Sequence, residues 1–192
     1  MSITKRAATL AVGSLVCFVL AGMHSPAVAQ RTKTQEKMVH AKAAPITKAV
    51  AILLPTKGNH VQGRVTFTEA GGTIHVHAEV YGLTPGEHGF HIHEFGVWSE
   101  DGMASGGHFN PTHQMHGSAD SPKRHVGDLG NLKANANGNA TLDLDDSMLS
   151  FHGAHSIIGR GLVVHEKADN FGQPVGNAGG RVAVGVIGIA KP

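Results

Sequence analysis

Histidine is the residue type with the clearest chemical message in this chain. The 192 residues include 15 histidines, and such an excess points to metal or proton chemistry rather than to packing. His91 and His93 are two positions apart, so in an extended strand both imidazoles lie on one face and can reach a single metal ion. His75 and His77 have the same spacing, and we expect this second pair to occupy the solvated face of a strand.

The first pair is distinguished by the candidate ligands that follow it. These are His108, His116, His125 and Asp128 in a segment rich in glycine and proline, and then His165. Three imidazoles and one carboxylate suit tetrahedral Zn²⁺, whereas four imidazoles suit Cu²⁺ in a tetragonal plane. Seven ligands for two such sites require one shared histidine, and His108 lies between the two sets along the chain. Spacing alone leaves open a two-metal site, independent single sites and surface histidines.

These side chains must be positioned by short strands. Hydrophobic residues make up 41% of the chain, aromatic residues 5%, and there are 26 glycines, a mixture that favours a turn-rich β fold. Alternating or apolar runs bounded by Gly, Pro and Asn occur at 49–54, 61–68, 73–81, 131–133, 140–144, 161–164 and 182–189. No segment has a sustained 3.6-residue period. We therefore predict an all-β sandwich or barrel of Greek-key type.

Two connections are longer than passive connectors need to be. They run between Phe95 and Gly127 and between Ala168 and Arg181. Loops of this length without regular structure tend to carry function. Three of the seven candidate ligands, His108, His116 and His125, fall in the first of them.

The amino-terminal residues are predicted to lie outside the fold. Residues 1–29 have the features of a secretory signal: Lys5 and Arg6, an apolar stretch at 7–22, and a small-x-small cleavage site at 27–29. The alternative, a membrane anchor, needs about 20 apolar residues. Residues 30–46 are polar and rich in lysine, as in a flexible leader, which leaves 47–192 as the folded domain. We expect an exported protein, periplasmic or extracellular, that does not stay in the membrane after cleavage.

Cleavage would also change the charge and the redox chemistry. Removal of two basic residues from 16 leaves 14, against 14 acidic residues. The mature chain is then close to neutral, and a nucleic-acid partner loses its main electrostatic support. The one cysteine, Cys17, leaves with the signal, so the mature domain cannot form a disulfide.

Five segments in order resemble the copper–zinc superoxide dismutase family, over residues 47–191. They are GFHIHEFG (89–96), HFNP (108–111), RHVGDLGN (124–131), LVVHEKAD (162–169) and GNAGGR (176–181). The resemblance implies an eight-stranded Greek-key barrel, similar to an immunoglobulin sandwich. It also implies disproportionation of superoxide to O₂ and H₂O₂ by a homodimeric enzyme with one copper and one zinc ion per chain.

Site residues follow from the same resemblance. The implied copper ligands are His91, His93, His108 and His165, and the implied zinc ligands are His108, His116, His125 and Asp128. His108 thereby bridges the two metals and stores a catalytic proton. Asp169 matches the carboxylate that links His91 to His116, and Arg181 matches the arginine that guides superoxide. Rival hypotheses are an exported copper/zinc-binding or delivery protein and a metal-free adhesion module.

Two departures from the family concern the loops. The family's disulfide would join the positions of Gly102 and Val184, and both cysteines are missing. The nearby Trp98 is apolar where an exposed loop is usually polar, and we expect it to dock the loop or to form an oligomer interface. The segment from Asp169 to Arg181 is shorter than in common members and lacks their charged cluster, so copper access should be more open.

Overall fold

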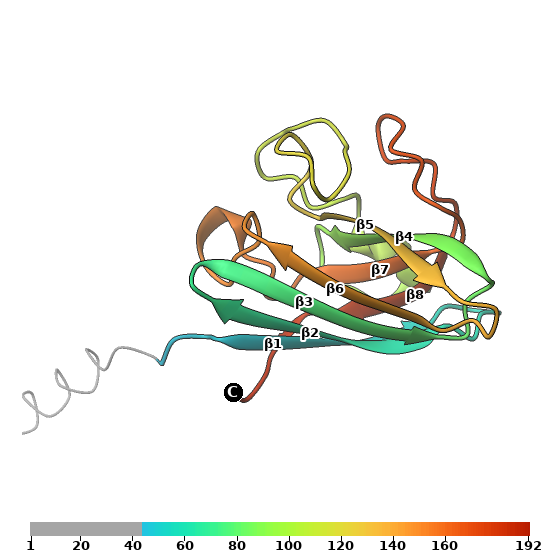
Figure 1. Ribbon diagram of the computed structural model, residues 1–192, viewed down its shortest axis with the longest axis horizontal. Coiled ribbons are helices and arrows are strands. Elements are labelled where there is room, and N and C mark those ends of the chain that lie inside the picture. Colours follow the sequence, from blue (N-terminus) through green and yellow to red (C-terminus); the bar gives the residue numbers. More distant parts are fainter. Residues whose placement is uncertain (1–43) are drawn as a thin grey trace, which may run out of the picture. The chain divides into compact units, whose positions relative to one another are not determined.

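The computed structural model describes residues 44–192, and these form a barrel of antiparallel strands (Figure 1). The strands are β1 (Lys48–Pro55), β2 (Gln62–Ala70), β3 (Thr73–Tyr81), β4 (Gly86–His93), β5 (Asp128–Ala134), β6 (Ala140–Asp146), β7 (Gly161–His165), β8 (Arg181–Val186) and β9 (Gly188–Ile189). Two short 3₁₀ helices, η1 (Glu100–Ser105) and η2 (Gly153–His155), lie in loops. The predicted signal segment 1–29 and nearly all of the predicted leader lie outside the described residues.

The strand order is β5-β4-β7-β8-β1-β2-β3-β6, and β9 pairs with β1 on the edge away from β2. Every pairing between these strands is antiparallel. Eight main strands thus make a nearly closed barrel, which confirms the predicted all-β class. Among the described residues, no helix is long and apolar enough to cross a membrane.

Alternation along the strands fills the barrel interior. In β2 the buried side chains are Val65 and Phe67, and in the facing β3 they include Val76 and Ala78. Polar residues take the intervening outward positions, as expected when one face of an antiparallel sheet meets solvent. Burial of this apolar surface is the main source of stability for the scaffold.

Strand β4 is the element that the apolar pattern did not single out. Its sequence GEHGFHIH is buried at each of its last six positions, polar and apolar alike, so burial does not alternate along it. The last predicted strand, 182–189, is in fact divided into β8 and β9 at Ile187, whose N–H donates to the carbonyl of Arg160 at 2.9 Å. The other predicted strands are present, with ends shifted by up to three residues.

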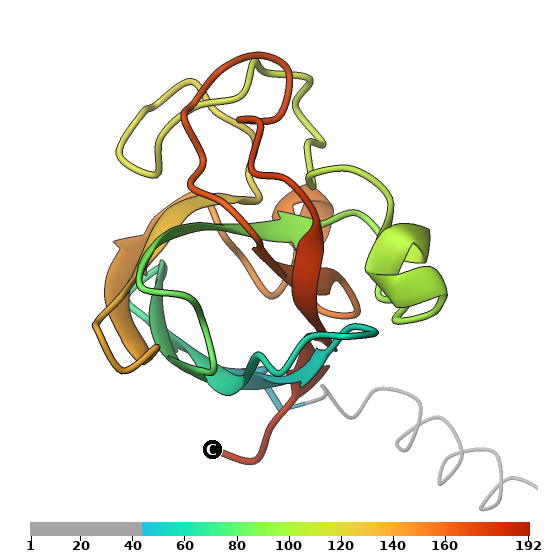
Figure 2. The same ribbon diagram turned by 90° about the vertical axis from the view of Figure 1, so that its right-hand side faces the viewer.

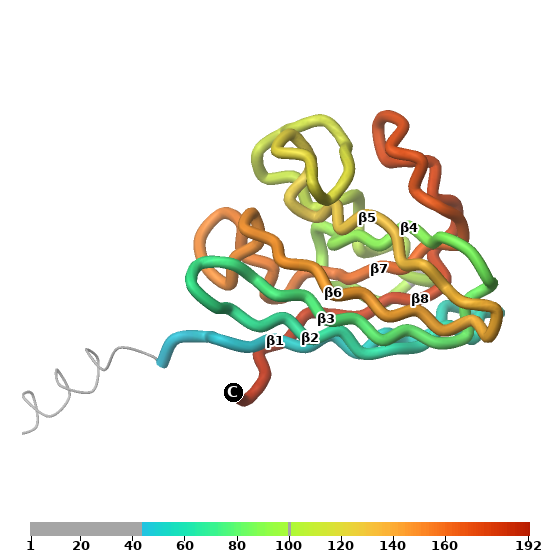
Figure 3. Tube along the Cα trace, viewed as in Figure 1, coloured from blue at the N-terminus to red at the C-terminus, as the bar shows by residue number. Residues whose placement is uncertain are grey.

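The long connections gather over the strands that carry the candidate ligands. Residues 94–127 and 166–180 rise over the β4, β5 and β7 region, as the Cα trace shows (Figure 3). In the view along the barrel, η1 stands beside β8 (Figure 2). The two loops therefore enclose the space above β4 and β7.

Candidate metal centre

Strand β4 carries two of the predicted ligands between core residues. Phe90 and Ile92 are fully buried in the barrel interior, while His91 and His93 alternate with them and point to the opposite face. Backbone pairing with β7 runs along this stretch, with His93 opposite Gly161. His91 and His93 thus share one face of β4, as their spacing predicted, and β4 is paired with β5 on one edge and β7 on the other.

Loop 94–127 is fixed to β4 by backbone contacts. The N–H of Phe109 donates to the carbonyl of Ile92 at 2.8 Å, and the N–H of Ile92 donates to that of Gly127 at 2.8 Å. A Cβ on Gly127 would overlap the carbonyl oxygen of Ile92, so only glycine permits this approach. These contacts place His108 directly beside His93.

Within the described residues, the candidate ligands converge into three buried groups. In each group one donor atom per residue lies within 4.8 Å of every other: His91, His93, His108 and His165; His108, His116, His125 and Asp128; and His91, His116 and Asp169. The structure therefore brings all seven predicted ligands together. His108 belongs to two groups, as a bridging residue must.

Asp128 organises the second group. Its carboxylate lies 2.9 Å from Nδ1 of His108 and 3.2 Å from Nδ1 of His125, and it accepts the backbone N–H of Gly117 at 3.1 Å. Burial would raise the pKa of Asp128, but its contacts with the histidines outweigh burial and lower the pKa far below its ordinary value. Asp128 is therefore an ionised, oxygen-donating ligand candidate.

Asp169 joins the first group to the second. Its two oxygens lie 2.8 Å from Nε2 of His91 and 2.9 Å from Nε2 of His116. Burial would raise the pKa of Asp169, but its contacts with His116 and His91 outweigh burial and lower the pKa below its usual range. Asn131 holds the backbone of Asp169 from both sides, at 2.8 and 2.9 Å. Only a glycine fits over the carboxylate at Gly176, because a Cβ there would overlap Oδ1.

Two buried histidine nitrogens in these groups have no hydrogen-bond partner and are suited to bind a metal ion. The Nδ1 atoms of His91 and His116 are buried and make no hydrogen bond. An unpaired buried polar atom costs about 1–3 kcal/mol. His116 Nδ1 lies 3.0 Å from an oxygen of Asp128 without the geometry of a hydrogen bond. Since each of these rings is held at Nε2 by Asp169, each presents Nδ1 to a metal.

The electrostatics of the first group favour neutral imidazoles. Burial lowers the pKa of His165 to about 3 and that of His108 to about 4. Burial and the neighbouring His108 place the pKa of His93 well below its ordinary value. Neutral imidazole is the form that binds a metal. His116 differs: burial would lower its pKa, but contacts with Asp128 and Asp169 outweigh burial and raise the pKa to about 9.

Arg181 stands at the rim of the first group. It lines a cavity of about 270 Å³ together with His93, His108 and His165. Its guanidinium donates to Ser105 Oγ at 2.8 Å, to the carbonyl of Gly106 at 2.6 Å and to the carbonyl of Gly102. Ser105 was not anticipated, since one serine in a polar loop gives no signal in the sequence. The arginine is thus held over the cavity by η1.

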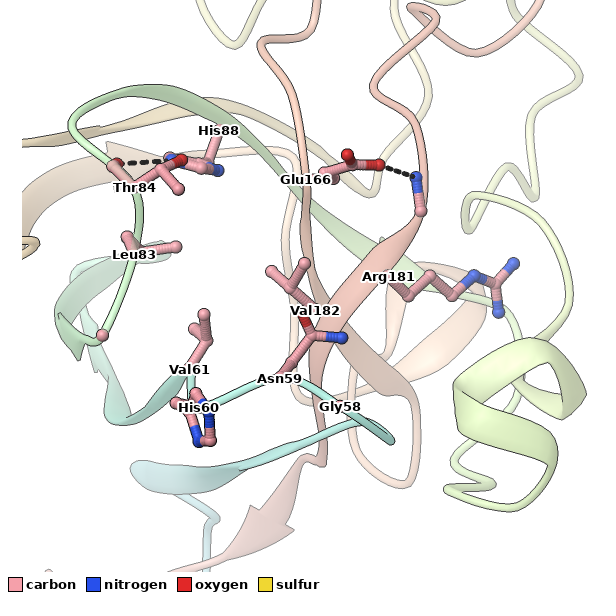
Figure 4. A pocket seen from close by; sticks show the side chains of 12 residues that line it. Gly58, Asn59, His60, Val61, Leu83, Thr84, His88, Glu166, Arg181 and Val182 are labelled. Carbon is pink, nitrogen blue, oxygen red and sulfur yellow. Dashed lines mark hydrogen bonds between the residues drawn. The ribbon is translucent and has the colours of Figure 1, made fainter.

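A larger cavity of about 440 Å³ lies on the other side of β8 (Figure 4). Figure 4 shows the side chain of Arg181 pointing away from it, toward η1. His88 lines this cavity, and its Nδ1 and Nε2 lie 2.8 Å from the carbonyl of His165 and 2.9 Å from that of Thr84. Both ring nitrogens of His88 are therefore engaged by backbone, so this residue supports His165 without joining the ligand groups.

The positions of the missing cysteines lie against each other. A Cβ on Gly102 would overlap Cγ2 of Val184. Trp98, in the same loop, is 41% exposed, so the expectation that it docks the loop by burial is not met within one chain. Gly102 packs against Val184, and its carbonyl accepts a hydrogen bond from Arg181. These contacts join the loop to β8 at the position of the family's disulfide.

Comparisons with known proteins agree with this geometry. The sequence profile of the family described as copper/zinc superoxide dismutase (SODC) matches residues 61–187. The chain is 41% identical over 152 residues to the extracellular superoxide dismutase [Cu-Zn] of Brugia pahangi, covering 74% of this chain and 76% of the relative. It is 43% identical over 156 residues to the protein of that name from Drosophila melanogaster, covering 76% and 86%.

A solved structure shows the same fold. The crystal structure of the clock protein EA4 aligns with a TM-score of 0.73 and 45% identity, covering 79% of this chain and 99% of that one. The fold, the paired ligand groups and the matched profile lead to one conclusion. The chain belongs to the copper/zinc superoxide dismutase family, and it is an oxidoreductase that disproportionates superoxide with copper and zinc as cofactors.

Proposed function

We propose that copper and zinc bind to two ligand sets in this chain that share His108. Copper is assigned to His91, His93, His108 and His165, and zinc to His108, His116, His125 and Asp128. The observation that carries the assignment is the pair of unpartnered nitrogens, Nδ1 of His91 and Nδ1 of His116, one in each set. Four imidazoles suit copper, and three imidazoles with a carboxylate suit zinc.

His108 is the residue through which the two sets communicate. Its Nδ1 faces Asp128 and His125, at 2.9 and 3.4 Å, which leaves Nε2 for the copper set. When bound, copper supplies the one-electron redox change that oxidises one superoxide and reduces the next. Reduction of superoxide to H₂O₂ consumes two protons, and His108 Nε2 is the atom that holds one and returns it.

Arg181 binds and orients the anionic substrate. It lines the cavity that leads to His93, His108 and His165, and a positive group there favours superoxide over neutral molecules. Residues 170–180 (NFGQPVGNAGG) carry no charged side chain. The guanidinium is therefore the principal positive charge that this loop region offers to the substrate.

The activity test uses metal-loaded protein of known copper and zinc content. Inhibition of superoxide-dependent dye reduction should scale with copper content, and copper-free protein of the same fold should be inactive. His152→Gln, at an exposed histidine of η2's flank, is a control that should keep full activity. A copper-loaded protein without activity would refute the catalytic assignment while leaving the metal sites intact.

We infer that the chain is exported and then cleaved. The curated relatives are extracellular enzymes, and residues 1–29 have the pattern of a signal peptide. The mature protein would begin at Gln30, with a leader at 30–46 and the enzyme domain at 47–192. Mass spectrometry of the protein from periplasmic and extracellular fractions tests this. An uncleaved chain retained inside the cell would refute it.

A homodimer is supported by an apolar surface. Ile52 and Leu54 on the outer face of β1 and Val186 on β8 are each 41–53% exposed. A Cβ on Gly96 would lie 2.9 Å from Val186 Cγ1, so the segment with Phe95, Val97 and Trp98 continues this surface. Exposed apolar patches of this kind mark association sites. We propose that a second copy covers it.

Sedimentation equilibrium of the metal-loaded protein tests the dimer. Leu54→Lys should weaken association at least tenfold, because a charge would be buried at the interface. Thr141→Lys, at an exposed residue on β6, three strands away from β1, is the control and should leave association unchanged. A wild-type chain that sediments as a monomer at micromolar concentration would refute the proposal.

A further inference from the structure

The outer face of β3 carries two histidines that the metal centre does not use. His75 and His77 lie two residues apart on this face, and their side chains are 45% and 41% exposed. The expectation of a solvated strand face holds for them. Neither residue belongs to any of the buried ligand groups.

The register of β6 brings two carboxylates to the same place. Asp145 pairs with His75, and Asp143 pairs with His77. Directly opposed residues on one face of antiparallel strands are close enough to interact. On the β2 side, the register neighbours of the two histidines are Thr68 and Thr66, so no basic side chain stands directly opposite them.

The two histidines and two carboxylates lie in direct contact with one another. His75 Nδ1 lies 2.8 Å from Asp145 Oδ1, and His77 Nδ1 lies 2.7 Å from Asp143 Oδ1. The same oxygen of Asp143 lies 3.4 Å from Nε2 of His75. Two ligands at about 2.0–2.1 Å from a tetrahedral zinc ion are themselves about 3.3 Å apart. The contact of Asp143 with His75 has this spacing, whereas its 2.7 Å contact with His77 is a hydrogen bond that a bound ion would replace.

The cluster also has the charge and mobility that a metal requires. Contact with His77 lowers the pKa of Asp143, so this carboxylate is ionised at neutral pH. All four side chains are at least 41% exposed, and their rotation can close the set around an ion. The pairing of imidazole with carboxylate selects zinc-like ions over Ca²⁺ or Mg²⁺, which prefer oxygen ligands alone.

We propose that His75, His77 and Asp143 form a third, exposed zinc-binding site, with Asp145 orienting the ring of His75. Water completes the coordination, since the surface is open. The site binds zinc more weakly than the buried set, because its side chains must be drawn together from solvent. It gives each chain an exchangeable zinc ion in addition to its resident copper and zinc.

Equilibrium dialysis of the fully metal-loaded protein against zinc tests this site directly. One further zinc ion per chain is expected. His77→Gln and Asp143→Asn should each weaken uptake at least tenfold, and Asp145→Asn should weaken it less. His152→Gln, at an exposed histidine for which the structure gives no carboxylate contact, is the matched control and should take up zinc as the wild type does. Dismutase activity per copper should stay constant in every variant, which shows that each has folded.

Three outcomes would overturn the proposal. The loaded protein could take up no further zinc, or His77→Gln and Asp143→Asn could retain the extra ion. A stoichiometry of one ion per two chains, with a zinc-dependent rise in mass on sedimentation, would show a site between copies instead. Since the proposal does not depend on catalysis, loss of activity from the buried centre would leave these measurements unaffected.

Discussion

Gly102 and Val184 touch so closely that the first residue has no room for a side chain. Gly102 has a φ of +81°, and a Cβ there would overlap Cγ2 of Val184. Gly102→Ala therefore adds a methyl group to a filled contact and a side chain to a left-handed backbone. Overpacking of this kind costs about 1–3 kcal/mol. We expect a lower free energy of unfolding and a displaced η1, measured by urea denaturation of the metal-loaded protein.

Two variants separate the contact from the backbone strain. Gly58 has a φ of +78°, and no atom lies within 4 Å of the place that its Cβ would take, so Gly58→Ala reports the strain alone. Val184→Ala should partly rescue Gly102→Ala, since it removes the overlapping methyl group. Equal losses for Gly58→Ala and Gly102→Ala, with no rescue, would show that the Gly102–Val184 contact does not hold the loop.

Replacement of Asp169 should loosen both metals together. Asp169→Asn keeps the shape but removes one acceptor and the charge, so it can no longer accept hydrogen bonds from both His91 and His116. Loss of such supporting contacts typically costs about 10–100-fold in metal affinity. Competition with a chelator, read out for copper and zinc separately, measures this. Asp120→Asn, at an exposed carboxylate, is the control. Loss of one metal alone would contradict the link.

His108 and His125 should differ in which metals they retain. His108 belongs to both ligand groups, whereas His125 belongs only to the group with Asp128. His108→Ala should therefore reduce copper and zinc content, and His125→Ala should chiefly reduce zinc. Elemental analysis after dialysis gives both contents. Retention of full zinc and copper by His108→Ala would rule out a bridging role.

Charge at Arg181 should control the rate at constant metal content. Arg181→Glu should lower the second-order rate constant by roughly 10-fold or more, the scale of electrostatic focusing. Arg181→Lys keeps the charge and should lose less. Charges more than about 8 Å apart are largely screened at physiological ionic strength, and residues 170–180 have none. The wild-type rate should thus fall only gently with salt. A rate indifferent to charge reversal would mean that superoxide reaches copper by another route.

Metal-free protein should be most stable near neutral pH. Burial lowers the pKa of His93 well below its ordinary value. It lowers the pKa of His108 to about 4 and that of His165 to about 3. The unfolded chain thus binds more protons below about pH 6.5, and stability falls as pH drops from there toward 4. His116, with a pKa raised to about 9, stabilises the fold below pH 6.5, and that contribution is lost as pH rises through 9. Thermal unfolding from pH 4 to 10 measures both limbs. A stability that rises from pH 6.5 to 4 would contradict the burial argument.

The sequence predicts most strands because one face of each strand is exposed to solvent, which makes polar and apolar residues alternate. Alternation in residues such as Val65 and Phe67 locates β2 and its neighbours, and the absence of a helical period excludes long helices. Strand β4 escapes this reasoning because the core covers one face and the metal centre covers the other. Its histidines still signalled a site, since His91 and His93 needed only a local strand to share a face.

The sequence pattern does not predict contacts between segments that are far apart in the chain. The role of Ser105 under Arg181 depends on a fold of η1 that no local signal specifies. The pairing of His77 with Asp143 depends on strand register, which alternation alone leaves undetermined. Family resemblance pointed to the proximity of Gly102 and Val184, whereas composition and spacing did not.

The first ligand group takes three of its four members from strands, whereas the second takes three of its four from loop 94–127. His91, His93 and His165 belong to β4 and β7, whose geometry is already fixed when the barrel closes. His116 and His125 belong to loop 94–127, whose order depends on few regular hydrogen bonds. Zinc held by the proposed ligand set would restrict this loop as a crosslink does. Assembly of this ligand group is therefore a problem of loop ordering, to which the bound ion would itself contribute.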